Sequence, residues 1–127
     1  MNFFRLFILK NFYLALFFLT SIFFLYSLYV LQFHYDGHHI GLMYSNALDF
    51  NKGKLPYKEI FIQYGLLTTI IHSVTLDLFD NNIFSLSIIT LTFYQLSILL
   101  ISLTINNLIN KEYAIISYLI LLMNHPI

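Results

Sequence analysis

The chain has 127 residues, of which 59% are hydrophobic and 9% are charged, and its six basic side chains balance six acidic ones. A typical soluble domain carries about 25% charged residues, so a chain this apolar could not cover its own surface in water. The zero net charge and the lack of a basic stripe give no support for nucleic acid as a partner. The absence of cysteine excludes disulfides and thiol chemistry. Composition therefore predicts a membrane protein.

An uncharged, largely apolar run covers residues 11–33. About 20 apolar residues cross the hydrocarbon core as a helix, so this run predicts a transmembrane helix. A signal peptide would have an apolar region of roughly 7–15 residues, followed by a small-residue cleavage site. Here the run is longer and leads into Gln32-Phe33-His34-Tyr35, which contains no such site. The segment is therefore interpreted as a retained anchor.

The basic residues of the N-terminus predict the orientation of this anchor. Arg5 and Lys10 precede the apolar run. Basic residues that flank a span favour the cytoplasmic side, so the N-terminus is expected in the cytoplasm. Residues 34–65 would then lie outside the inner (plasma) membrane.

Residues 34–65 form a polar loop that carries half of the formal charges of the chain and three of its five histidines. Within the loop, residues 41–52 are predicted to form a short interfacial helix, because Met43, Ala47 and Phe50 share one helical face. Such a helix can lie flat with its apolar side in lipid. Gly53 can adopt the left-handed cap conformation, so the helix is expected to stop there.

Three more apolar runs follow, and they predict helices at residues 66–79, 83–105 and 113–125. Together with the first helix they predict an all-α membrane protein with about four transmembrane helices in one multi-pass domain. Alternation across the membrane places the turn at Asp80 inside and the link at residues 106–112 outside. Lys111 on the outer side departs from the positive-inside rule. The chain is interpreted as the N-terminal fragment of a longer protein.

The region from Tyr35 to Phe79 resembles the N-terminal part of GT-C-type polytopic membrane glycosyltransferases. This superfamily includes mannosyltransferases and arabinosyltransferases that use a polyprenyl-phosphate-linked sugar. The resemblance is carried by the segments Asp36-Gly37-His38-His39, Asn46-Ala47-Leu48, Gly53-Lys54-Leu55-Pro56-Tyr57-Lys58-Glu59-Ile60-Phe61 and Gln63-Tyr64-Gly65-Leu66-Leu67. It implies a partial GT-C fold, membrane lipid and a polyprenyl-phosphate sugar donor as partners, and a glycan or lipid acceptor of the cell envelope.

Asp36 is the catalytic candidate that the resemblance implies. Sugar transfer needs a base that takes a proton from the acceptor hydroxyl as this hydroxyl attacks the anomeric carbon. The alternative is structural, since aspartate is a favoured N-cap and a helix is predicted to follow.

The substrate-binding candidates are His38, His39, Tyr57, Lys58, Glu59, Gln63 and Tyr64. The two histidines can form hydrogen bonds with phosphate or sugar, bind a divalent metal, or simply lie at the membrane interface, and the metal is the least favoured of these roles. Metal sites usually need three or four convergent ligands, so a metal is possible but no ligand set is assigned. Lys58 can neutralise the leaving phosphate. Its alternative role is that of a lysine at the membrane surface, with the stem in the interface and the ammonium in water.

The resulting hypothesis is a glycosyltransferase fragment that is expected to be inactive without the rest of its chain. Two alternatives stay open, namely a non-catalytic transporter and an assembly subunit of envelope-glycan export. Transporters favour broken helices with polar sites near the membrane midplane, whereas the polar residues here gather in a loop. The transporter is therefore ranked below the enzyme.

Overall fold

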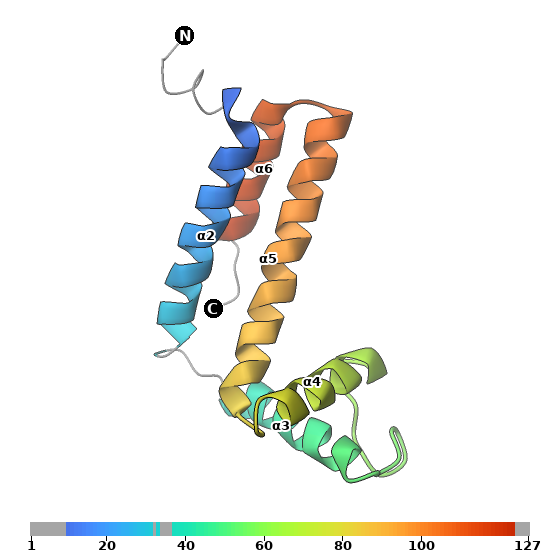
Figure 1. Ribbon diagram of the computed structural model, residues 1–127. Coiled ribbons are helices and arrows are strands. Elements are labelled where there is room, and N and C mark those ends of the chain that lie inside the picture. Colours follow the sequence, from blue (N-terminus) through green and yellow to red (C-terminus); the bar gives the residue numbers. More distant parts are fainter. Residues whose placement is uncertain (1–9, 32, 34–36, 124–127) are drawn as a thin grey trace. The chain divides into compact units, whose positions relative to one another are not determined.

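The computed structural model describes residues 10–31, 33 and 37–123, and Figure 1 shows that the ordered elements are helices. The helices are α2 (Phe12–Leu31), α3 (Gly37–Asn51), α4 (Leu66–Leu78), α5 (Ile83–Leu108) and α6 (Lys111–Met123). Within the described residues, the strand-like pairing is limited to an isolated bridge between Pro56 and Ile60. The prediction of an all-α protein is confirmed.

Two of these helices, α2 and α5, are long and apolar enough to cross a membrane. They contain 20 and 26 residues, whereas α4 and α6 contain 13 each. At about 1.5 Å per residue, a helix of 13 residues reaches roughly 20 Å, which is less than the hydrocarbon thickness of about 30 Å. Two helices of spanning length support a membrane protein, and the count of four spans stays a prediction.

The chain divides into two compact units, one formed by residues 1–32 and 91–127 and the other by residues 33–90. In the first unit, α2, the later part of α5 and α6 share a buried core that consists of Phe12, Leu16, Ile98, Ala114, Tyr118 and Leu122. Hydroxyl groups add bonds between the helices. The Ser102 hydroxyl donates to the carbonyl of Ala114 over 2.8 Å, and the Tyr94 hydroxyl donates to the carbonyl of Leu121 over 2.9 Å. Such bonds hold apolar helices together where the hydrophobic effect is weak.

The second unit is built on a hairpin in which α3 packs against α4. Ala47 of α3, Leu76 of α4 and Leu86 at the start of α5 form its buried centre, and Met43 packs against this centre. Protein therefore covers Ala47 fully and Met43 in part, and the interfacial position of the helix stays a prediction.

A polar clamp closes the hairpin where α3 ends. The side-chain amide of Asn51 donates to the carboxylate of Asp77 over 2.7 Å and to the carbonyl of Ser73 over 3.3 Å. The Ser73 hydroxyl donates in return to the amide oxygen of Asn51. One side chain of α3 thus bonds to two successive turns of α4.

The loop between the two helices begins at a glycine, as predicted. Gly53 has a φ of 81°, and its backbone N–H donates to the carbonyl of Phe50 over 2.9 Å. A left-handed conformation costs glycine little, because glycine has no Cβ. Helix α3 therefore ends one turn before Leu55, and the following residues are free to form the loop. The start of α3 differs from the prediction, since the helix begins at Gly37 rather than at residue 41.

Replacing Asn51 with alanine should destabilise the hairpin by roughly 1–3 kcal/mol, because the buried Ser73 and the exposed Asp77 of α4 both lose a hydrogen-bond partner. Since 1.4 kcal/mol is a tenfold change in an equilibrium constant, amide exchange in α3 and α4 should accelerate by about tenfold. Hydrogen–deuterium exchange with peptide-level mass spectrometry measures this effect. The Asn107→Ala variant, at an exposed position of α5, is the matched control. Unchanged exchange in Asn51→Ala would show that the amide does not hold the hairpin.

Candidate functional site

The proposed catalytic residue, Asp36, lies outside the described residues, as does His34. Helix α3 begins at Gly37, and both His38 and His39 lie in its first turn with exposed side chains. The two imidazole rings meet edge to face with centroids 5.4 Å apart. The catalytic role of Asp36 stays a prediction, and the structure informs on the residues that follow it.

His39 and Tyr64 are brought together from opposite ends of the predicted site. The hydroxyl of Tyr64 is hydrogen-bonded to Nδ1 of His39, and the ring centroids are 5.9 Å apart. Imidazole and phenol can each donate or accept a hydrogen bond, depending on the tautomer of the histidine. The pair therefore joins the start of α3 to the end of the loop and offers polar atoms at that junction.

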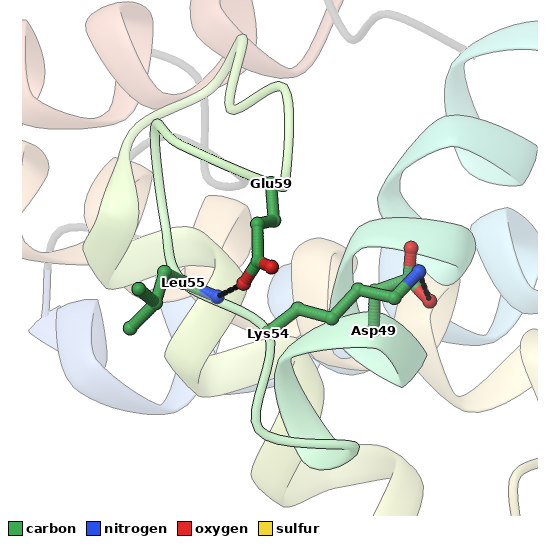
Figure 2. A network of polar contacts seen from close by, with 4 residues as sticks. All are labelled: Asp49, Lys54, Leu55 and Glu59. Carbon is green, nitrogen blue, oxygen red and sulfur yellow. Dashed lines mark hydrogen bonds and ion pairs between the residues drawn. The ribbon is translucent and has the colours of Figure 1, made fainter.

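Glu59 holds a tight turn in the loop. Its carboxylate accepts a hydrogen bond from the backbone N–H of Leu55 over 2.8 Å, as Figure 2 shows. The Leu55 carbonyl in turn accepts bonds from the backbone amides of Lys58, Glu59 and Ile60 at 3.3, 2.9 and 3.3 Å. Glu59 thus has a structural role in this turn, and one of its oxygens is already committed to the backbone.

Tyr57 occupies a backbone conformation that is unusual for a residue with a side chain. Its φ is 62°, and its backbone N–H donates to the carbonyl of Ile60 over 3.1 Å. A positive φ is uncommon outside glycine, and such residues tend to mark functional sites. The Tyr57 side chain is 68% exposed, so its ring projects from the turn into the surroundings.

Lys58 and Gln63 are also exposed. Five of the seven predicted binding candidates fall into two groups. His39 and Tyr64 form a bonded pair, while Tyr57, Lys58 and Glu59 belong to the turn. A second lysine of the loop, Lys54, forms an ion pair of 2.8 Å with Asp49, which Figure 2 also shows. The described residues contain no group of three or more histidine, aspartate or glutamate side chains that could hold a metal ion.

Asn46 fixes the loop from the side of α3. Asn46 is buried, and its amide donates to the carbonyl of Phe61 over 2.7 Å. Together with the Asn51 clamp, this bond shows that the amides of α3 organise the loop. One feature of the sequence could have indicated a polar partner for α4. Ser73 and Asp77 lie four residues apart and therefore on one face of that helix.

His72 is buried in α4, which is not one of the two helices of spanning length. Burial lowers the pKa of its imidazole from the ordinary value of 6.5, because the charged form loses its hydration. A neutral imidazole at pH 7 fits a packing role in the hairpin better than the binding of an anion.

The first unit contains an apolar groove of about 520 Å³ along α2 and the later part of α5. It is lined by Tyr13, Leu16, Phe17, Thr20, Ser21, Phe24, Leu25, Leu99 and Leu103. Close to it, Gln95 is buried, and neither atom of its amide group has a hydrogen-bond partner among the described residues.

Comparisons of the chain with protein-family models, curated proteins and solved structures yield no match.

Removing the carboxylate of Glu59 should loosen the turn that carries Tyr57 and Lys58. In Glu59→Ala the backbone N–H of Leu55 loses its partner, so amide exchange at residues 58–60 should accelerate. Glu59→Gln retains a side-chain oxygen that can accept the same bond, so it should exchange more slowly than the alanine variant. Hydrogen–deuterium exchange of the loop peptide tests this order. Equal exchange in wild type and Glu59→Ala would contradict the structural role of the carboxylate.

Proposed function

We propose that this chain is the membrane-anchored N-terminal part of a GT-C-like glycosyltransferase. The reaction is the transfer of a sugar from a polyprenyl-phosphate donor to a glycan or lipid acceptor of the cell envelope. The proposal rests on the resemblance of residues 35–79 to that superfamily. The single structural observation that supports it most is the bond between His39 and Tyr64.

This bond matters because both residues belong to the segments that carry the resemblance. Asp36 precedes His39 by three residues in the sequence. The proposal assigns Asp36 as the base that acts together with the His39–Tyr64 pair. A carboxylate, an imidazole and a phenol are a suitable set for binding a sugar and taking a proton from a hydroxyl.

In the proposed reaction, Asp36 takes the proton of the acceptor hydroxyl as its oxygen bonds to the anomeric carbon. The bond between that carbon and the phosphate oxygen of the donor breaks, and polyprenyl phosphate leaves. Lys58 neutralises the charge that develops on the phosphate. His39 and Tyr64 hold the donor by hydrogen bonds.

The proposed location is the inner membrane, with the N-terminus in the cytoplasm. We favour an arrangement in which α2 and α5 are successive spans and residues 33–82 connect them on the outer side. Lys111 then lies on the same side as Lys10, in agreement with the positive-inside rule, whereas four spans would separate them. The lengths of α2 and α5 support this arrangement.

Asp36→Asn should lower sugar transfer by about a hundredfold or more, because the general base is lost. The measurement uses membranes from cells that express the longer protein of which this chain is the proposed N-terminal part, supplied with radiolabelled polyprenyl-phosphate sugars, together with cross-linking to a photoreactive donor analogue. Cross-linking should persist in the variant, because the amide keeps the shape of the carboxylate. Asp80→Asn, the same change in an exposed turn of the second unit, is the control and should transfer normally. Full transfer by Asp36→Asn, or a wild-type chain that the donor analogue does not label, would overturn the proposal.

A further inference from the structure

The connection between α3 and α4 exposes large apolar side chains within a short length of chain. Tyr57 is 68% exposed, Phe61 is 73% exposed and Leu67, in the first turn of α4, is 70% exposed. Leu55 is exposed as well. Contiguous exposed apolar surface in a protein marks contact with another protein or with a membrane. We call residues 52–65 the connecting loop, and Leu67 lies directly after it in α4.

The connecting loop is held in shape before it meets any partner. The Leu55 carbonyl binds three backbone amides, the Glu59 carboxylate binds the N–H of Leu55, and Asn46 holds the carbonyl of Phe61. Tyr64 is fixed by its bond to His39. A surface that is already ordered loses less conformational entropy on binding, so the exposed rings of Tyr57 and Phe61 are prepared for contact.

The charge of the connecting loop selects the partner. Residues 52–65 contain three lysines and one glutamate. Lys54 is paired with Asp49, and the Glu59 carboxylate is bound to the backbone. Lys52 and Lys58 are exposed and form no ion pair with the carboxylates of the described residues. The loop therefore presents two available ammonium groups beside exposed aromatic rings. Such a surface is complementary to a partner that has an apolar interior and anionic groups at its surface.

The place of the loop in the chain points to a bilayer rather than to a soluble partner. The second unit follows α2 and precedes most of α5, which are the two helices of spanning length. A segment tethered at both ends to spans meets the membrane surface at a high effective concentration, whereas a soluble partner must bind from solution. Aromatic rings and lysines are favoured at the interface, and anionic lipids attract basic segments.

We propose that the connecting loop is a lipid-binding element that inserts Tyr57 and Phe61 into the headgroup region of an anionic bilayer. Lys52 and Lys58 bind the lipid phosphates from the water side. This contact shares Lys58 with the proposed sugar transfer, but it requires neither Asp36 nor a glycosyl donor, so it can be tested separately.

The chain contains no tryptophan, so a single introduced tryptophan reports on its own position. The Phe61→Trp variant is reconstituted in nanodiscs that contain phosphatidylglycerol and phospholipids brominated near the headgroup. We expect blue-shifted emission, quenching by the brominated lipid and protection from aqueous iodide. Ser45→Trp, at an exposed position of α3, is the control and should show the opposite pattern. Quenching of Phe61→Trp by iodide alone would overturn the proposal, because the ring would then face water or a soluble partner.

The role of the lysines is tested with the same reporter. Lipid quenching of Phe61→Trp should be stronger in phosphatidylglycerol nanodiscs than in purely zwitterionic ones. This difference should disappear when Lys52→Ser and Lys58→Ser are added, while Lys111→Ser should preserve it. Equal quenching in both lipid mixtures with the lysines intact would overturn the assignment of an anionic surface.

Discussion

The bonds between Asn51 and α4 are the constraint on which the second unit depends. They fix the end of α3 against Ser73 and Asp77, so that the loop between the helices starts and ends at defined positions. Asn46 and His39 then hold the later part of the loop through Phe61 and Tyr64. A helix hairpin with a loose loop would expose polar backbone without presenting any side chain in a fixed place. Here the amides of α3 give the loop a definite shape.

The shape of the loop separates structural residues from available ones. The Glu59 carboxylate holds the turn and Asp49 pairs with Lys54, so these charged groups stabilise the loop itself. Tyr57 and Lys58 project from the turn, and they remain available for a ligand or for lipid. Both proposed roles, donor binding and membrane contact, use side chains that the loop leaves available. They differ in the residues they require, because sugar transfer depends on Asp36 and the lipid contact does not.

The sequence predicted the helices well, because each apolar run is interrupted by glycine, asparagine or charged residues. The predicted helices were 11–33, 41–52, 66–79, 83–105 and 113–125, and the observed ones are 12–31, 37–51, 66–78, 83–108 and 111–123. The largest error is the start of α3, where Gly37 and two histidines give weak helical signals. Contacts between residues far apart, such as Asn51 with Ser73 or His39 with Tyr64, could not be read from one sequence, because periodicity reports only local structure. The sequence could not show whether α4 crosses the membrane. An apolar run indicates that a helix is buried, but it does not indicate whether lipid or protein covers the helix.

The central claim is that the α3–α4 hairpin lies on one side of the membrane between two spans. The chain has no cysteine, so Ser45→Cys, Asp80→Cys and Asn107→Cys each supply a single site for a membrane-impermeant maleimide on intact cells. Our account predicts labelling from outside at positions 45 and 80 and protection at position 107 until the membrane is opened. Labelling at 45 and 107 with protection at 80 would mean that α4 crosses the membrane, and it would contradict the account.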